Sequence, residues 1–275
     1  MTTRVNERTA LVTGATAGLG AEFARQLAES GHHLVLVARD EQRLKEKAAE
    51  LERDFSISAE TLAADLTTDV GVAAVADRLR DAARPVDVLV NNAGIGLLKS
   101  FEDNDVDEER KHLRLHVQTP MELSHAALEV MLPRGEGRII NVASVAAFAN
   151  RGTYSAAKAW QVTFSRWANT SYGKSGVQVT AVCPGFTHTE FHDRMGMDKS
   201  VAPRFLWLTA ERVVREGLAD NKHGKAVSIP TRRYKVLSFF ARILPAQLTA
   251  GPPRRPLEPR PLEPRPLEPR PLEPS

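Results

Sequence analysis

The chain has 275 residues, of which 42% are hydrophobic, and a formal net charge of +3. This composition allows a substantial folded core, and no apolar run approaches the roughly 18 to 20 residues that a membrane-spanning helix needs. The positive charge gathers at the C-terminal end, where residues 221–275 carry 11 Lys or Arg against 4 Glu. The rest of the chain is mildly acidic and lacks a dense basic stripe, so we expect no nucleic acid as a partner.

The single cysteine, Cys183, excludes a disulfide within the chain. The first residues, MTTRVNERTA, contain no apolar stretch of the kind that a signal peptide carries. Both features favour a cytoplasmic location, where thiols stay reduced.

Apolar runs alternate with segments of helical periodicity along residues 1–230. A long helix is expected from about Asp107 to Met131, and strands are expected at 9–15, 33–39, 60–66, 86–94, 138–144 and 177–185, with a last one within 225–234. Strands that lack polar alternation and are separated by helices predict a parallel sheet covered on both faces. The sequence therefore predicts one α/β domain, a doubly wound Rossmann-type sheet, with its ligand at the carboxyl ends of the strands.

The first strand runs directly into a glycine-rich turn, TGATAGLG, at 13–20. Glycines let the backbone turn tightly and approach a pyrophosphate, whose charge the N-terminus of the next helix favours. A tight turn without a ligand is the alternative. The position between strand and helix predicts a dinucleotide site formed by Gly14, Thr16, Ala17, Gly18, Leu19 and Gly20.

The second strand ends in VARDEQR, with Arg39 at its end and Asp40 directly after it. A guanidinium at this place can pair with the 2′-phosphate of NADP(H), whereas an acidic side chain that faces the ribose favours NAD(H). We expect Arg39 to face the cofactor, which favours NADP(H) over NAD(H). The alternative for Arg39 is a solvated charge at a helix start.

Several further motifs follow one another along the chain. Besides TGATAGLG, they are Asp65 after the third strand, NNAG at 91–94, Ser144 in NVASVAA, YSAAK at 154–158 and PGFTHT at 184–189. This ordered set resembles the short-chain dehydrogenase/reductase family. The resemblance implies cofactor contacts for Asp65, Leu66, Asn91, Ala93, Gly94, Pro184, Gly185, Thr187 and Thr189, and a homodimer or homotetramer formed through the two long helices that flank the fifth strand.

Tyr154 and Lys158 are four residues apart and so share one face of a helix. A free tyrosine has a pKa of about 10, and a nearby ammonium together with an oxidised nicotinamide would lower this pKa. Tyr154 then exchanges a proton with the substrate oxygen, to which Ser144 donates a hydrogen bond. The alternative is an inert pair on a wet helical face.

One position departs from the family pattern. Members usually carry an asparagine on the long helix, where it helps to hold a water that extends a proton relay from the lysine, and this chain has His116 there. An imidazole can pass protons, so the relay is expected to persist in altered form. A broken relay, leaving a cofactor-binding sensor or scaffold with impaired turnover, is the second function considered, and a purely structural His116 is a further alternative.

The segment after the sixth strand predicts a hydrophobic substrate. It gathers flexible thioethers and flat rings that suit an adaptable apolar pocket for a ketone, aldehyde or alcohol. These side chains are Phe186, Phe191, Met195, Met197, Phe205, Leu206 and Trp207. The alternative is that they only seal the loop. The remaining histidines show no ligand pattern for a metal, so none is expected.

The C-terminal part divides into two segments. Residues 231–250 contain YKVLSFFARILP, a basic amphipathic pattern that covers the protein's own surface or lies on an anionic membrane. Residues 251–275 contain four repeats of RPLEP from Arg255, and the frequent prolines predict an extended tail without a core.

Overall fold

The computed structural model of the chain describes residues 8–97, 99–189 and 203–244. Within these residues one sheet contains seven strands in the order β3-β2-β1-β4-β5-β6-β7, and all neighbouring pairs are parallel. The strands are β1 Thr9–Thr13, β2 His33–Ala38, β3 Ala59–Ala63, β4 Val88–Asn91, β5 Gly137–Val142, β6 Val177–Val182 and β7 Val227–Ser228.

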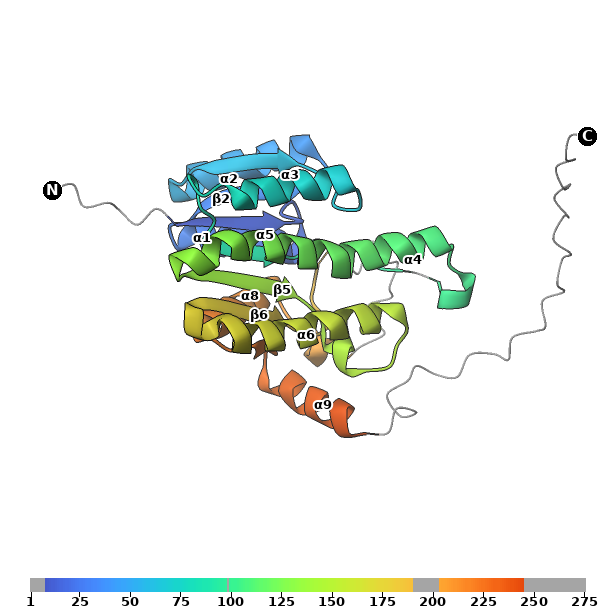
Figure 1. The fold of residues 1–275 in the computed structure, drawn as a ribbon. Coiled ribbons are helices and arrows are strands. Elements are labelled where there is room, and N and C mark those ends of the chain that lie inside the picture. Colours follow the sequence, from blue (N-terminus) through green and yellow to red (C-terminus); the bar gives the residue numbers. More distant parts are fainter. Residues whose placement is uncertain (1–7, 98, 190–202, 245–275) are drawn as a thin grey trace, which may run out of the picture.

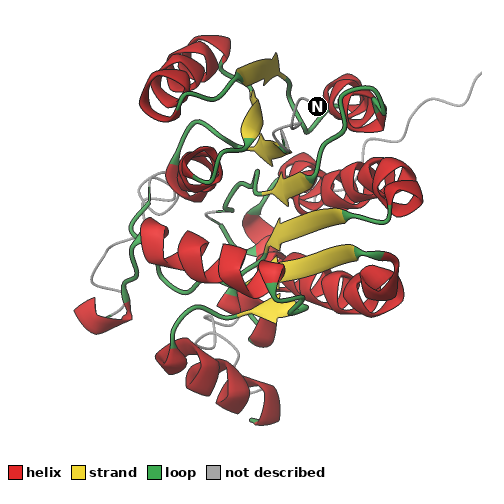
Figure 2. Cartoon of the chain, turned by 90° about the vertical axis from the view of Figure 1, so that its left-hand side faces the viewer, coloured by secondary structure: helices red, strands yellow, loops and turns green. Residues whose placement is uncertain are grey.

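Helices cover both faces of this sheet (Figures 1 and 2). They are α1 Gly18–Glu29, α2 Glu41–Phe55, α3 Asp69–Arg80, α4 Val106–Leu113, α5 Thr119–Arg134, α6 Thr153–Tyr172, α8 Ala210–Lys222 and α9 Arg232–Ile243, with single turns at η1 Phe101–Asp103, η2 Arg114–Gln118, η3 Val145–Phe148, η4 Gly173–Ser175 and η6 Arg204–Leu206. The predicted doubly wound α/β fold is confirmed.

Neighbouring residues of β1 belong to different cores. Val12 packs with Phe23 of α1 in the core that also contains residues of α2 and α8. Leu11 points to the other side, into the core shared with Val75 of α3 and Leu123 of α5. Because both faces of the strand are buried, its sequence is continuously apolar.

The predicted long helix is interrupted in the structure. Between α4 and α5, residues Arg114–Gln118 form the π-helical turn η2. Pro120 follows this turn, and a proline cannot donate the hydrogen bond that a regular helix requires from residue 120 to the carbonyl of His116. The regular α-helical bond from residue 120 to that carbonyl is therefore not made.

Two further differences concern the C-terminal third. Helix α8 was not among the elements expected from the sequence, and it supplies Val213 and Val214 to the first core. The last strand is confined to Val227–Ser228, and the basic segment after it forms α9. In the described ranges no helix combines the length and apolarity needed to cross a bilayer.

Candidate active site

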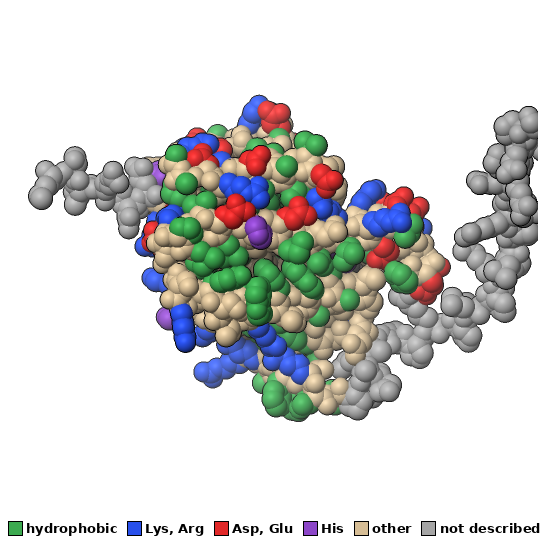
Figure 3. Space-filling model, in the orientation of Figure 1, with side chains coloured by type: hydrophobic (Ala, Val, Ile, Leu, Met, Phe, Trp, Pro, Cys, Tyr) green, Lys and Arg blue, Asp and Glu red, His purple; other side chains and the backbone are tan. Residues whose placement is uncertain are grey.

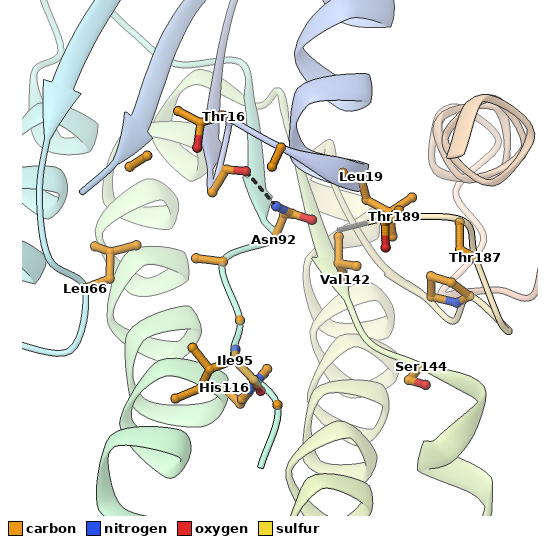
Figure 4. A pocket seen from close by; sticks show the side chains of 18 of the residues that line it. Thr16, Leu19, Leu66, Asn92, Ile95, His116, Val142, Ser144, Thr187 and Thr189 are labelled. Atoms are coloured by element: carbon orange, nitrogen blue, oxygen red, sulfur yellow. Dashed lines mark hydrogen bonds between the residues drawn. The ribbon is translucent and has the colours of Figure 1, made fainter. Parts of the chain in front are cut away.

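A cavity of about 650 Å³ lies at the carboxyl ends of the central strands, where the strand order reverses between β1 and β4 (Figure 4). It brings together most of the residues that the sequence predicts for the site. Those lining it are Gly14, Thr16, Ala17, Gly18, Leu19, Arg39, Leu66, Ala93, Gly94, His116, Ser144, Tyr154, Lys158, Pro184, Gly185, Thr187 and Thr189.

The glycine turn is shaped by close contacts of its backbone. Gly14 has φ +66°, and a Cβ atom there would lie 2.9 Å from Asn92 Nδ2. A Cβ on Gly20 would lie 2.1 Å from the carbonyl oxygen of Gly14, which explains the glycine although Gly20 does not line the cavity. This glycine allows α1 to start directly beneath the turn, with its free N–H groups at the cavity.

Asn92 is a cavity residue that the sequence analysis missed. Its Nδ2 atom donates to the carbonyl oxygen of Thr13 at 2.8 Å, and its backbone N–H donates to Thr13 Oγ1 at 2.9 Å, so β4 is tied to the glycine turn. Asn91 points away from the cavity and donates to Ser124 and Asn141 in the interior. Successive side chains of a strand point to opposite faces of the sheet. This rule could have predicted that only one of the two asparagines faces the cavity.

Asp65 also lies outside the lining. Its Oδ1 accepts hydrogen bonds from the backbone N–H of Thr67 at 2.9 Å and from Thr67 Oγ1 at 2.8 Å. Partial burial acts to raise the pKa of Asp65, but these hydrogen bonds and the charge of Arg39 outweigh it and lower the pKa. Asp65 thus shapes the loop, while its neighbour Leu66 faces the cavity.

Three charged residues form the rim next to β2. Arg39, Asp40 and Arg43 all line the cavity and are exposed. The carboxylate of Asp40 caps α2 by accepting a hydrogen bond from the backbone N–H of Arg43 at 3.0 Å. Arg43 in turn donates from Nη2 to the carbonyl oxygen of Thr16 at 3.2 Å. Arg43 was not predicted from the sequence, and its position in the first turn of a capped helix was the available signal.

Ser144, Tyr154 and Lys158 converge at the inner end of the cavity. Ser144 follows β5 and its hydroxyl accepts a hydrogen bond from the backbone N–H of Ala146 at 3.1 Å. A side-chain hydrogen bond joins Ser144 and Tyr154, and Lys158 Nζ lies 5.7 Å from the centre of the Tyr154 ring. The serine, the phenol and the amine are therefore close enough to act on one substrate oxygen.

Lys158 is 4% exposed and is held by two acceptors. Its Nζ donates to the carbonyl oxygen of Val142 at 2.7 Å and to Gln161 Oε1 at 3.1 Å. Gln161 Nε2 then donates to the backbone carbonyl of His116 at 3.0 Å. Gln161 was not among the site residues predicted from the sequence.

His116 is 1% exposed and lies against the loop that follows β4, next to Ile95 (Figure 4). Its Nε2 atom lies 2.8 Å from the carbonyl oxygen of Ile95, to which it donates when it carries the hydrogen. Its ring centre is 4.5 Å from that of His112 and 5.7 Å from that of Tyr154. Burial, and then the charge of Lys158, hold the pKa of His116 well below its usual value, so both ring contacts involve a neutral imidazole.

Burial dominates the protonation of the central pair. It raises the pKa of Tyr154 to about 12, against the opposing effect of the hydrogen bond with Ser144, and it lowers the pKa of Lys158 to about 7. The sequence analysis expected the ammonium and an oxidised nicotinamide to lower the tyrosine pKa. In the protein alone the direction is opposite, because burial disfavours the phenolate and because the Lys158 amine, with its own pKa lowered to about 7, is uncharged where the phenol titrates.

The loop after β6 is held by a tyrosine from α9. Tyr234 accepts a hydrogen bond from the backbone N–H of Phe186 at 3.0 Å and donates to the carbonyl oxygen of Leu206 at 2.9 Å. Its ring fills the space above Gly185, where a Cβ atom would lie 1.9 Å from the ring. Thr187, which lines the cavity, is positioned through this anchored loop.

The residues expected to form the apolar substrate pocket have different positions. Phe186 packs on Trp207 with ring centres 5.6 Å apart, and Phe205 is 61% exposed. None of the described members of this set lines the cavity, and Phe191, Met195 and Met197 lie outside the described residues.

The lining fits a dinucleotide by its shape and charge. The backbone at Gly14 leaves no room for a side chain, and two guanidinium groups stand at the rim. Within residues 8–97, 99–189 and 203–244 no group of three or more His, Cys, Asp or Glu side chains is placed to hold a metal ion.

Comparison with known proteins identifies the family. The short chain dehydrogenase family matches residues 8–200, well over half of the chain, and the chain belongs to it. An uncharacterized oxidoreductase of Staphylococcus saprophyticus is 32% identical over 188 residues, covering 67% of this chain and 80% of the relative.

Two solved structures are similar over most of the chain. A short-chain dehydrogenase from Sphingobium yanoikuyae in complex with NADPH has a TM-score of 0.78 at 33% identity, covering 84% of this chain and 92% of the other. The bulky-bulky ketone specific alcohol dehydrogenase from Comamonas testosteroni has a TM-score of 0.74 at 29% identity, with coverage of 86% and 92%. The protein is an oxidoreductase that acts on CH–OH groups with NAD(P).

Proposed function

We propose that the chain interconverts a carbonyl and an alcohol on a hydrophobic substrate, uses NADP(H) in preference to NAD(H), and employs Tyr154 as the general acid and base. The observation that carries this proposal is the convergence of Ser144, Tyr154 and Lys158 on one end of a cavity that begins at the glycine turn.

The chain's own groups handle the substrate oxygen and its proton. Ser144 and Tyr154 both present a hydroxyl to that oxygen, and Tyr154, protonated at neutral pH, gives up its proton when a carbonyl is reduced. A bound nicotinamide supplies or accepts the hydride and, when oxidised, adds a positive charge that favours the phenolate. In alcohol oxidation the phenolate of Tyr154, which the Lys158 ammonium stabilises, takes the proton from the alcohol.

The rim beside β2 supports the preference for NADP(H). Asp40 is engaged as the cap of α2, so its carboxylate is directed at the helix rather than left to bind a ribose hydroxyl. Arg39 and Arg43 place two guanidinium groups at the same rim, which suits a 2′-phosphate.

The inner end of the cavity supports a hydrophobic substrate. The lining includes the apolar residues Ile95, Val142 and Ala143, and the single acidic residue in the described lining is Asp40, which follows β2. The similarity to an alcohol dehydrogenase specific for bulky-bulky ketones points the same way.

A turnover screen tests this function. Ketones and aldehydes of graded size and charge are offered with NADPH and with NADH in parallel, and cofactor fluorescence is followed. We expect oxidation of NADPH by apolar carbonyls at a higher kcat/KM than with NADH. Activity confined to small charged substrates, or equal use of both cofactors, would contradict the corresponding part of the proposal.

Helix α9 supports a peripheral contact with an anionic membrane. Its exposed apolar side chains include Phe239 at 59%, Phe240 at 51% and Ile243 at 63%, and its charged residues are all basic (Figures 1 and 3). We expect vesicles containing phosphatidylserine to sediment the protein in a salt-sensitive way, and Phe240→Glu to abolish this, while Val70→Glu on α3 has no effect. Equal sedimentation of the Phe240→Glu variant would exclude α9 as the contact.

A further inference from the structure

Gln161 connects two parts of the active site through its carboxamide. The residue is 1% exposed on α6, one turn beyond Lys158. Its oxygen accepts a hydrogen bond from Lys158 Nζ at 3.1 Å, and its nitrogen donates to the His116 carbonyl at 3.0 Å. Because a buried carboxamide with both ends engaged is fixed in one orientation, it also fixes the groups that it joins.

The acceptor on His116 exists because of the residue that follows four positions later. In a regular α-helix the N–H of residue 120 would donate to the carbonyl of His116, and Pro120 has no N–H. The buried carbonyl accepts a hydrogen bond from Gln161 Nε2 in place of the one that Pro120 cannot make. The glutamine in α6 therefore provides a donor for the carbonyl to which the proline in α5 cannot donate.

We propose that Gln161 is a positioning residue for Lys158, holding the amine by a direct contact with the protein at the place where the family resemblance implies a water. This inference rests on the proposed function. Lys158 is thereby fixed between the carbonyl of Val142 and the oxygen of Gln161. The third N–H of its ammonium can then donate on the side of Tyr154.

The groups around Lys158 determine how strongly Gln161 can influence the protonation of the Lys158 amine. The titratable groups that face it are Tyr154 on α6, His112 on α4, His116 on η2 and Cys183 after β6. Burial raises the pKa of Tyr154 and of Cys183 to about 12 and lowers the pKa of both imidazoles, so none of these groups is charged at neutral pH. The two oxygen acceptors therefore provide the hydrogen bonds that favour the ammonium.

Three variants of the full chain test the inference. Gln161→Leu removes both hydrogen bonds, Gln161→Glu keeps an acceptor and adds a charge, and Ser165→Ala is the matched control. Ser165 is a fully buried polar residue one turn further along α6, and it accepts a hydrogen bond from Asn141 at 2.9 Å without touching Lys158. The titration of Lys158 is followed by NMR of the lysine ε-carbon, and the pH profile of kcat by turnover.

We expect the midpoint of Lys158 titration to fall in Gln161→Leu, to rise in Gln161→Glu and to stay unchanged in Ser165→Ala. We also expect kcat to fall by about tenfold or more in Gln161→Leu, while the Kd for NADPH changes less than twofold. Pro120→Ala offers a second route, since the restored N–H competes for the His116 carbonyl and should lower the midpoint without altering Gln161.

An unchanged midpoint in both Gln161→Leu and Pro120→Ala would overturn the inference. If Gln161→Leu does not fold, an unchanged midpoint in Pro120→Ala alone would do so. The NMR titration needs no turnover, so an inactive wild type with the expected midpoints would contradict the proposed function alone. An active wild type with unchanged midpoints would contradict only the role of Gln161.

Discussion

At the scale of single residues, the chemistry of the site depends on burial more than on sequence spacing. The four-residue interval between Tyr154 and Lys158 brings the pair to one helical face, as expected. The spacing gave no indication that burial would raise the pKa of the phenol and lower the pKa of the amine. Those shifts come from burial, and elements that are distant in the sequence contribute to it, among them η2 with the buried ring of His116 beside Tyr154.

The pKa of Lys158 predicts how stability depends on pH. The pKa is about 7 in the folded protein, below its usual value of 10.5, so between these values the unfolded chain binds the additional proton. The contribution of Lys158 to the free energy of unfolding therefore rises from about pH 7 to pH 10.5. Urea unfolding across this range should show a steeper rise for the wild type than for Lys158→Met. Parallel curves would show that Lys158 has its ordinary pKa.

The structure also predicts a mild effect for His116→Asn. The group of His116 that Gln161 contacts is the backbone carbonyl, which an asparagine retains. We expect kcat to stay within a few fold of the wild type. A complete loss of turnover, with folding intact by circular dichroism, would show that the imidazole has a specialised role in the reaction.

At the scale of secondary structure, the buried strands and the glycine turn were predictable and the breaks between elements were not. Continuous apolar runs identified β1, β2 and β4 because both faces of the sheet are covered. The π turn η2 escaped prediction because apolar periodicity continues across it, although Pro120 was a visible signal. Helix α8 was missed in a segment in which six of the 13 residues are charged.

The contact between α9 and the loop after β6 gives a test at this scale. In Tyr234→Phe the N–H of Phe186 and the carbonyl of Leu206 lose their hydroxyl partner. We expect the free energy of unfolding to fall by about 1 to 3 kcal/mol and the KM for substrate to rise. Tyr172→Phe, in which the ring of Tyr172 still packs on Trp167, is the control and should change neither. Equal effects in both variants would exclude a specific role for the Tyr234 hydroxyl.

At the scale of the whole molecule, apolar side chains gather over the face formed by α5 and α6 (Figure 3). The exposed fractions are 44% for Met121 and 55% for Trp167, whose ring adjoins Phe164. The family resemblance implies that these helices pair in a homodimer or homotetramer. The exposed apolar side chains on this face support that prediction.

Light scattering after size exclusion tests the assembly. We expect a mass of at least twice 30.2 kDa for the wild type and a reduced mass for Trp167→Asp. Val70→Asp, at a side chain 81% exposed on α3, should leave the mass unchanged. A wild type that elutes as a monomer, or a Trp167→Asp variant that retains its assembly, would contradict pairing through this face.

The most direct test of the central assignment compares wild type and Tyr154→Phe in two measurements on the same preparation, NADPH binding by fluorescence and carbonyl turnover. The phenol supplies the proton, whereas the glycine turn and the arginine rim bind the cofactor. We therefore expect NADPH binding to persist within a few fold while kcat falls by about 100-fold or more. A Tyr154→Phe variant that reduces the substrate at the wild-type rate would contradict the assignment.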